Sequence, residues 1–287
     1  MTKGNIPLKK YVLYNPIAGN GNGRREAKNL AERFGAENLV LCDVREIENY
    51  ADFFAQLDGI ADVIVCGGDG TLNRFVNTIK DLKIKNPLYY FACGTGNDFL
   101  RDVEHDNGLI SLTPYLENLP TVSVQGKEYR FINGVGYGID GYCCEVGDKL
   151  RMQKPGEAIN YTGIAIKGLL FHYKPVSATV IVDGKEYRFK KVWLAPTMNG
   201  RFYGGGMLPA PEQRREQATV SVMVFHGTGK IKSLLLFPSI FKGEHVKKAK
   251  HISVLSGNEI TVRYDEPRAL QIDGETIVNV SQYTVKK

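Results

Sequence analysis

The chain has 287 residues, 43% hydrophobic and 24% charged, which excludes a disordered or low-complexity protein and suits two hydrophobic cores. Its formal net charge of +6 suits an anionic partner, such as a nucleotide, a phospholipid or a nucleic acid, without choosing among them. The sequence lacks an apolar stretch long enough to span a bilayer, and its first residues lack the apolar core of a signal peptide. The five cysteines show no metal-ligand spacing, so we expect reduced thiols in a cytoplasmic protein.

The first half of the chain alternates short apolar runs with stretches at helical spacing. Strand, turn and helix in succession are typical of a parallel sheet covered by helices, so we predict a three-layer α/β domain over residues 1–122. The expected strands are 11–14, 39–42, 61–66 and 88–93, and the expected helices are 24–34, 49–57, one around 72–79 and one starting near 97.

The second half, residues 123–287, is predicted to be an antiparallel, β-rich domain with at most two helices, at 159–173 and 230–241. Its strands are separated by hairpin signals, of which Asp183-Gly184 is the strongest. The expected strands are 122–124, 129–133, 176–182, 186–194, 220–226, 251–255, 259–264, 270–273 and 276–285.

Three strand-to-helix junctions of the first half have unusual turn chemistry. They are Asn-Pro-Ile-Ala-Gly at 15–19, Gly-Gly-Asp-Gly-Thr at 67–71 and Gly-Thr-Gly-Asn-Asp at 94–98. Turns that leave the carboxyl ends of parallel strands lie on one edge of the sheet, so these three can converge on one ligand. Glycine allows close backbone approach, and the amides of a helix that begins there favour a phosphate group.

Asp69 lies inside this expected phosphate cradle, where two anions would repel each other unless Mg²⁺ sits between them. Asp98 offers a second carboxylate for the same ion or its waters, and Thr71 can cap a helix or donate a hydroxyl to phosphate. The alternative is that each glycine pair is a tight turn with Asp and Thr as helix caps; three such turns together favour the ligand site. The chain lacks the P-loop motif and a complete dinucleotide-binding fingerprint, which disfavours an ordinary dehydrogenase.

Together with later motifs, these turns resemble the diacylglycerol kinase catalytic-domain family, which includes bacterial soluble lipid kinases and sphingosine kinases and is related to NAD kinases. The later motifs are Phe-Ile-Asn-Gly-Val-Gly at 131–136, Gly-Gly-Gly-Met at 204–207 and Asp-Gly-Glu at 273–275. The resemblance implies an NAD-kinase-like α/β domain followed by a β-sandwich-like domain for the lipid or other acceptor. Return of the last strand to the first domain is one option.

The resemblance also implies roles for individual residues. Asp69, Asp273 and Glu275 would be the catalytic carboxylates, because an alcohol needs a proton acceptor as it attacks the γ-phosphorus. Asp69 and Asp98 would organise the Mg²⁺. From the residues alone, Asp273-Gly274 could equally be a plain hairpin turn like Asp183-Gly184. The residues that would hold ATP are Asn15, Gly67, Gly68, Asp69, Gly70, Thr71, Leu72, Asn73, Thr95 and Asn97.

Two departures from the family pattern concern a structural metal. Many bacterial members have Asp-Asp-Gly after the Gly-Gly-Gly-Met motif, but residues 211–220 here read PEQRREQATV, which leaves Glu216 as the remaining candidate ligand. The domain junction, Pro-Thr-Val-Ser at 120–123, also lacks the aspartate that joins the magnesium network in related kinases.

The favoured hypothesis is an ATP-dependent lipid kinase that phosphorylates a hydroxyl of diacylglycerol or a related lipid alcohol in phospholipid metabolism. The alternatives are an NAD-kinase-like enzyme with a non-lipid acceptor, and a catalytically weakened member that binds nucleotide or lipid. We expect a cytoplasmic protein that meets its lipid at a membrane surface, forms a homodimer as one option and does not bind nucleic acid. Residues 230–241 could be an interfacial segment or, as favoured, a core-packing helix with solvated lysines.

Overall fold

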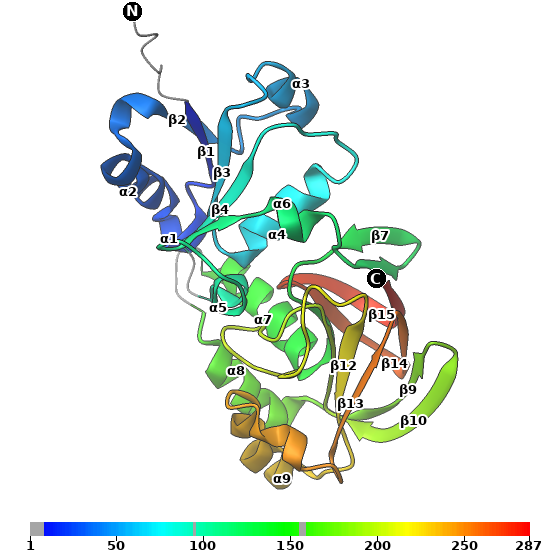
Figure 1. The fold of residues 1–287 in the computed structure, drawn as a ribbon. Coiled ribbons are helices and arrows are strands. Elements are labelled where there is room, and N and C mark those ends of the chain that lie inside the picture. The colour runs from blue at the N-terminus through cyan, green and yellow to red at the C-terminus, as the bar shows by residue number, and fades with distance from the viewer. Residues whose placement is uncertain (1–8, 94–95, 155–158) are drawn as a thin grey trace, which may run out of the picture. The chain divides into compact units, whose positions relative to one another are not determined.

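The computed structural model describes residues 9–93, 96–154 and 159–287 (Figure 1). The chain forms two compact units, Met1–Glu117 and Asn118–Lys287. This division lies ahead of the predicted boundary at 122, because strand β6 (Thr121–Val124) pairs with β15 (Glu275–Lys286) of the second unit. β15 also pairs with β14 (Glu259–Ile272), so the last strand lies within the second unit and does not return to the first.

The first unit contains a five-stranded sheet in the order β2-β1-β3-β4-β5. The first four strands are parallel and β5 runs antiparallel to β4, which confirms the predicted mostly parallel α/β domain. The strands are β1 (Lys10–Tyr14), β2 (Leu39–Asp43), β3 (Asp62–Gly67), β4 (Leu88–Ala92) and β5 (Leu109–Ser111).

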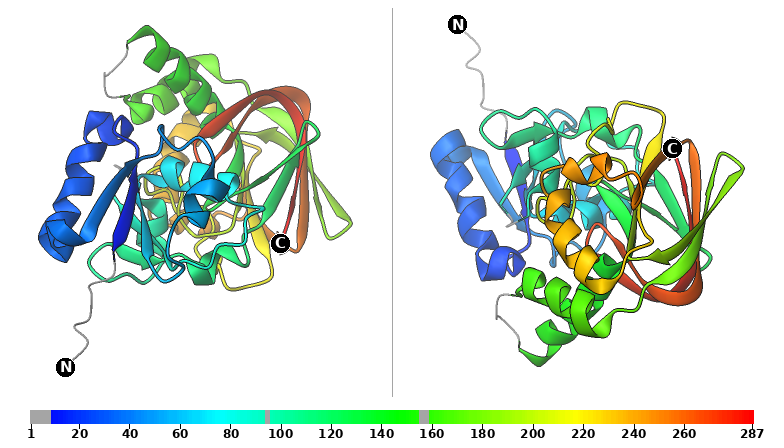
Figure 2. Two further views of the ribbon diagram at one scale, coloured as in Figure 1. Left: turned by 90° about the horizontal axis from the view of Figure 1, so that it is seen from above. Right: turned by 90° about the horizontal axis from the view of Figure 1, so that it is seen from below.

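Helices cover the sheet of the first unit, as expected for parallel strands with a buried central run. Ala27 and Leu30 of α2 pack against Val12 and Ile64 of β1 and β3. Helix α4 lies on the other side of the sheet (Figures 1 and 2). The helices are α1 (Ala18–Gly21), α2 (Gly23–Phe34), η1 (Ala36–Asn38), α3 (Tyr50–Ala55), α4 (Asp69–Thr78), α5 (Asp98–Asp102) and α6 (Thr113–Leu116).

The second unit is built on an antiparallel sheet, which confirms the predicted β-rich domain. Its strand order is β13-β12-β11-β8-β14-β15-β6-β7, with β9 paired to β14 and β10 paired to β9. Its core is rich in β-branched side chains, as half-buried strands favour. The strands not yet given are β7 (Lys127–Arg130), β8 (Gly134–Gly138), β9 (Val176–Val182), β10 (Lys185–Val192), β11 (Leu194–Met198), β12 (Val220–Phe225) and β13 (Ile252–Gly257).

The prediction of at most two helices in the second unit was wrong. Helix α7 (Ile139–Gln153) was missed, because its two glycines and two adjacent cysteines weaken the apolar periodicity. Gly141 is needed for packing, since a Cβ there would lie 2.0 Å from the carbonyl oxygen of Ala269 on β14. Within the described part of the chain, none of the helices has the length and apolar character required to cross a bilayer. The other helices are α8 (Tyr161–Lys167), the π-helical turn η2 (Gly168–His172), α9 (Lys230–Leu236), η3 (Phe237–Ile240) and η4 (Glu244–Lys247).

Candidate functional site

The three glycine-containing turns of the first unit leave the same edge of its sheet. They follow β1, β3 and β4, which are neighbouring parallel strands, as the sequence predicts. The second turn begins beside the end of β4, because the amide of Cys93, which precedes the third turn, donates to the carbonyl oxygen of Gly67 at 2.9 Å. Gly94 and Thr95, which belong to the third turn, lie outside the described residues.

Asp69 joins the second turn to the third. Its carboxylate oxygens accept hydrogen bonds from the amides of Asp98 at 3.0 Å and Phe99 at 3.1 Å, at the start of α5. Asp69 is itself the first residue of α4, and Gly68 is the N-cap of that helix. One carboxylate therefore fixes the spacing between the beginnings of two helices at this edge.

Two glycines are required by close contacts within these turns. A Cβ on Gly67 would lie 2.5 Å from Cβ of Thr71, so the turn after β3 can close only around glycine. A Cβ on Gly23 would lie 1.9 Å from the carbonyl oxygen of Asn15, whose side chain accepts from the amide of Ile17 at 3.2 Å. The first turn is therefore folded tightly onto Asn15.

The other predicted nucleotide-binding residues have different surroundings. Leu72 is fully buried and Asn73 is 5% exposed, so Leu72 is a core residue of α4 whose side chain faces away from solvent. Asn97 has a φ of 49° in the left-handed region and is the N-cap of α5. Gly70 lies in the first turn of α4, where backbone amides favour a phosphate group.

The carboxylates of the first unit are compatible with Mg²⁺. This ion takes oxygen ligands and is usually held by one or two carboxylates together with phosphate oxygens and water. Asp69 is partly exposed at the start of α4, whereas Asp98 is buried, with 4% of its surface exposed. Asp69 is therefore the better placed of the two, and the magnesium role of both stays a prediction. The described residues hold no group of three His, Cys, Asp or Glu side chains arranged for a metal.

Glu216 does not fit a metal site. Its side chain is exposed, and the neighbouring Arg215 is buried, with its guanidinium donating to the carbonyl oxygen of Ile132 and to Oδ1 of Asn133. Lys287 donates to the carbonyl oxygen of Arg215, and burial, with a contribution from the Arg215 charge, lowers the pKa of Lys287 to about 8. The chain thus places two cationic side chains next to Glu216. The reaction proposed below therefore uses no metal ion at this position.

In the second unit, Asp273 closes the hairpin between β14 and β15. Its carboxylate accepts hydrogen bonds from the amides of Ile132, Asn133 and Gly134 at 2.5, 2.8 and 2.9 Å. Its φ of 46° is in the left-handed region that an Asp-Gly hairpin turn requires. Glu275, the first residue of β15, is exposed. The geometry therefore gives Asp273 a clear structural role and presents Glu275 to solvent.

Sequence reasoning missed a buried carboxyl group near this hairpin, that of Asp140. Gln271 connects the two: its Oε1 accepts from the Gly274 amide at 2.8 Å, and its Nε2 lies 3.5 Å from Oδ2 of Asp140. The Tyr203 hydroxyl lies 3.4 Å from the same oxygen, and burial raises the pKa of Asp140 to about 6. A carboxylate two residues after the glycine-rich apolar strand β8 was the signal that could have drawn attention to Asp140.

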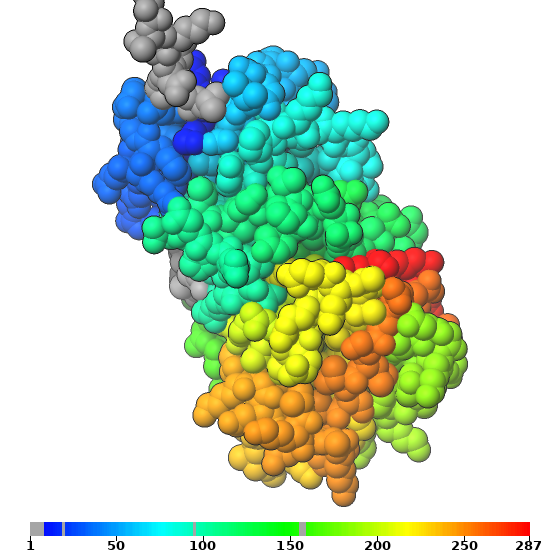
Figure 3. Space-filling view, viewed as in Figure 1, coloured from blue at the N-terminus to red at the C-terminus, as the bar shows by residue number. Residues whose placement is uncertain are grey.

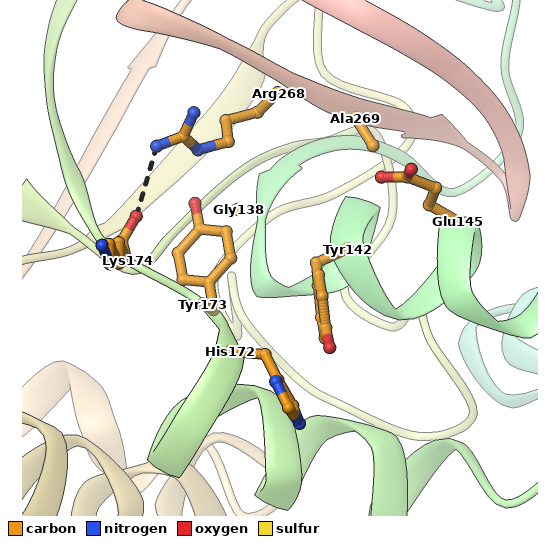
Figure 4. Close-up of a pocket in the computed structure, with 8 residues that line it drawn as sticks. All are labelled: Gly138, Tyr142, Glu145, His172, Tyr173, Lys174, Arg268 and Ala269. Atoms are coloured by element: carbon orange, nitrogen blue, oxygen red, sulfur yellow. Dashed lines mark hydrogen bonds between the residues drawn. The ribbon is translucent and has the colours of Figure 1, made fainter.

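A cavity of about 250 Å³ opens in the second unit beside α7 (Figure 4). Figure 4 shows the Tyr173 ring between Arg268 and His172, with its hydroxyl pointing toward the guanidinium. The lining combines aromatic rings with charged groups of both signs, which suits an amphipathic molecule. The lining residues are Gly138, Tyr142, Glu145, His172, Tyr173, Lys174, Arg268 and Ala269.

Comparison with known proteins agrees with this architecture. The family profile described as the diacylglycerol kinase catalytic domain matches residues 9–121, and that of the YegS C-terminal NAD kinase beta sandwich-like domain matches residues 133–285. The chain belongs to the diacylglycerol kinase catalytic-domain family. The resemblance seen in the glycine motifs is therefore confirmed, and the family is one of lipid kinases.

Similar members of the family are named as diacylglycerol kinases. One from Mycobacterium tuberculosis is 28% identical, with 83% of this chain and 80% of that protein covered. One from Bacillus subtilis is 24% identical, with 92% of this chain and 88% of that protein covered. A solved diacylglycerol kinase structure from Bacillus anthracis superposes with a TM-score of 0.60 at 20% identity and covers 97% of this chain and 94% of the other, which shows the fold.

Proposed function

We propose that this family member is an ATP-dependent lipid kinase that transfers the γ-phosphoryl group to a hydroxyl of diacylglycerol or a related lipid alcohol. The observation that carries the proposal is the junction of the second and third turns through Asp69 at the carboxyl edge of a parallel sheet. This arrangement brings glycine-rich backbone, a helix N-terminus and a carboxylate to one place. Such a combination suits the phosphates of a nucleoside triphosphate and their Mg²⁺ ion.

In the proposed reaction, the acceptor hydroxyl oxygen forms a bond to the γ-phosphorus while the bond from that phosphorus to the ADP oxygen breaks. The hydroxyl proton passes to a carboxylate. Glu275 is the favoured acceptor of this proton, because three backbone amides already bind Asp273 and direct its carboxylate toward residues 132–134. Mg²⁺, held by Asp69 and by Asp98 directly or through water, would neutralise the negative charge on the phosphates.

The acceptor in this proposal is a lipid met at a membrane surface by a cytoplasmic, peripherally bound enzyme of phospholipid metabolism. The cavity beside α7 supports an amphipathic acceptor, since tyrosine rings and charged groups line it together. Gln271 would be a positioning residue, because it bonds the turn that precedes Glu275 and approaches Asp140.

The test is incubation of the protein with labelled ATP, Mg²⁺ and a panel of diacylglycerol, other lipid alcohols, a sphingoid base and NAD, followed by chromatography. We expect a labelled phospholipid. Glu275→Gln should lower kcat by on the order of a hundredfold or more, with little change in ATP binding. Glu186→Gln is the matched control, because it removes an exposed carboxylate shortly after the other Asp-Gly hairpin turn.

Two outcomes would contradict the proposal. Label on NAD and on no lipid would assign the NAD-kinase-like alternative. Magnesium-dependent binding of ATP without transfer to any member of the panel would assign a binding protein that has lost catalysis. Equal rates for wild type and Glu275→Gln would remove Glu275 from the mechanism and reduce residues 273–275 to a turn.

A further inference from the structure

The second unit exposes large apolar side chains on two helical segments, α8–η2 and α9–η3. Ile231 and Leu235 are each 74% exposed, and Phe171 is 70% exposed. Ile166 on α8 and Phe241, directly after η3, are 43% and 45% exposed. We call these five side chains the apolar face. Single exposed apolar side chains need no explanation, whereas several on neighbouring segments indicate an interaction site.

Helix α9 presents apolar residues on both of its sides. Ser233 is fully buried and bonds the Thr228 hydroxyl, while Leu234 and Leu236 pack against the core of the unit. Ile231 and Leu235 are four residues apart and therefore share the opposite, outward side. A solvated helix normally carries polar residues there. The favoured core-packing prediction for 230–241 thus holds for one side of the helix only.

The two segments of the apolar face are neighbours. The ammonium group of Lys230 on α9 donates to the carbonyl oxygen of Leu170 in η2 at 2.9 Å. Figure 1 shows α9 beside the turn that follows α8, and in Figure 3 the orange part of the chain, which begins near the end of α9, lies at the surface.

The stretches of chain that carry the apolar face are rich in lysine. Residues 159–175 and 229–250 contain eight lysines and a single acidic residue, Glu244. With eight lysines and one glutamate, the net charge of these two segments is +7, which exceeds the net charge of +6 of the whole chain. All eight lysines are exposed; they are Lys167, Lys174, Lys230, Lys232, Lys242, Lys247, Lys248 and Lys250.

We propose that this apolar face docks onto an anionic lipid bilayer. The outward apolar side chains would enter the boundary between headgroups and acyl chains, while the lysines meet the negative headgroups. A second copy of the chain is a poor occupant, because a symmetric contact would bring the lysines of the two copies together. The proposal rests on the proposed function, since it says where a lipid kinase would meet its acceptor. His172 and Lys174, which line the cavity, lie at and just after the end of η2.

The experiment is sedimentation of the full chain with vesicles of phosphatidylcholine alone or of phosphatidylcholine with phosphatidylglycerol. We expect binding to the anionic vesicles that weakens when salt rises from about 0.1 M to about 0.5 M. The double variant Ile231→Gln, Leu235→Gln should bind at least about tenfold more weakly, because two apolar side chains no longer enter the bilayer. The matched control is Ile60→Gln, Val278→Gln, which changes apolar side chains that are 58% and 55% exposed on elements that do not belong to the apolar face.

A second variant, Lys232→Glu with Lys242→Glu, should also lose binding to anionic vesicles, which keeps the test valid if the glutamine variant fails to fold. Binding of both folded variants at the wild-type level would overturn the proposal. The proposal would also be overturned if wild type eluted as a dimer and the glutamine variant as a monomer on gel filtration while vesicle binding stayed the same. That result would assign the apolar face to contact with a second copy of the chain.

Kinase assays separate this inference from the proposed function. With detergent-dispersed lipid, the glutamine variant should keep wild-type activity, whereas with vesicles its rate should fall in step with its binding. If wild type binds vesicles through this face but phosphorylates no lipid, the docking face stands and the proposed function fails. If the lipid is phosphorylated and the variants bind normally, the function stands and the docking face fails.

Discussion

At the scale of single residues, Asp140 links burial to pH dependence. Burial raises its pKa from 3.8 to about 6, so between these values the folded protein binds more protons than the unfolded chain. The free energy of unfolding therefore falls as pH rises through this range, by an amount on the order of 3 kcal/mol. Above about pH 6 the folded protein carries a buried carboxylate, whose burial is only partly compensated by the Gly141 amide at 2.9 Å and by the longer contacts with Tyr203 and Gln271 at 3.4 and 3.5 Å.

Asp140→Asn should consequently stabilise the protein at pH 7.5 and have little effect near pH 4. The asparagine has no charge to bury, and its amide can still bond the neighbouring groups. The measurement is Tm as a function of pH for wild type, Asp140→Asn and the exposed control Asp52→Asn. A Tm difference between Asp140→Asn and wild type that does not change with pH would show that Asp140 does not titrate in this range.

Arg215 gives a prediction about metal removal. Its guanidinium bonds the Ile132 carbonyl oxygen and Asn133, and Lys287 bonds the Arg215 carbonyl oxygen, so the chain supplies its own cations beside Glu216. Without nucleotide, a chelator should leave Tm unchanged. Arg215→Ala should lower the free energy of unfolding by about 3 kcal/mol, because buried acceptors lose a charged donor. A chelator-induced fall in Tm would reveal a resident metal in the apo protein.

The site residues that sequence could predict are those in local motifs. The glycine turns and Asp69 follow from strand–turn–helix order, because parallel strands bring their carboxyl ends to one edge. The partners of Asp69 could not be predicted in the same way, since its bonds to the amides of Asp98 and Phe99 depend on how two turns pack. Asp140 and Gln271 lie 131 positions apart, and only the folded sheet brings them together.

At the scale of elements, the two Asp-Gly hairpins form a natural pair for comparison. Asp183 has a φ of 48° and accepts from the amides of Asn258 and Glu259, while Asp273 has a φ of 46° and accepts from three amides. Asp183→Ala and Asp273→Ala should each lower the free energy of unfolding by about 1–3 kcal/mol, with the larger loss at Asp273, because more backbone donors lose their acceptor.

Urea unfolding of both variants checks this order, and the lipid kinase assay separates their functions. Asp183→Ala should keep full activity, whereas Asp273→Ala should lose it, because the turn that carries Glu275 would no longer be fixed. Asp273→Asn should retain most of the stability, since asparagine tolerates a positive φ and can still accept hydrogen bonds. Equal activity in the two alanine variants would show that the position of the second hairpin does not matter for catalysis.

The prediction of helices and strands succeeded where the local sequence pattern determines the structure, and it failed where packing between distant segments determines it. The hairpin at Asp183-Gly184 forms as predicted, because its turn chemistry specifies the connection. The expected strands at 259–264 and 270–273 are one long strand, β14, whose pairing with β15 shifts register between Arg263 and Leu270. Helix α7 was missed because its glycines fit against β14 and Tyr161, contacts between segments that no local window contains.

At the scale of the whole molecule, the two units divide the proposed work. The turns proposed to bind the nucleotide belong to the first unit, and the carboxylates proposed to act on the acceptor, the cavity and the apolar face belong to the second. The division follows the change from strand–helix alternation to hairpins that the sequence shows. The composition could not predict the concentration of lysines around an apolar face, because it averages this region with the rest of the chain.

This division predicts where nucleotide changes hydrogen exchange across the full chain. Binding stabilises the residues that it contacts, so Mg²⁺-ATP should slow amide exchange in peptides covering 15–23, 67–73 and 96–102. The β9–β10 hairpin should be unchanged and serves as the internal control. In Asp69→Ala, the amides of Asp98 and Phe99 should exchange faster even without nucleotide, because they lose the carboxylate that accepts their hydrogen bonds. Unchanged exchange at all three turns with saturating Mg²⁺-ATP would place the nucleotide elsewhere and remove the basis for a kinase site at this edge.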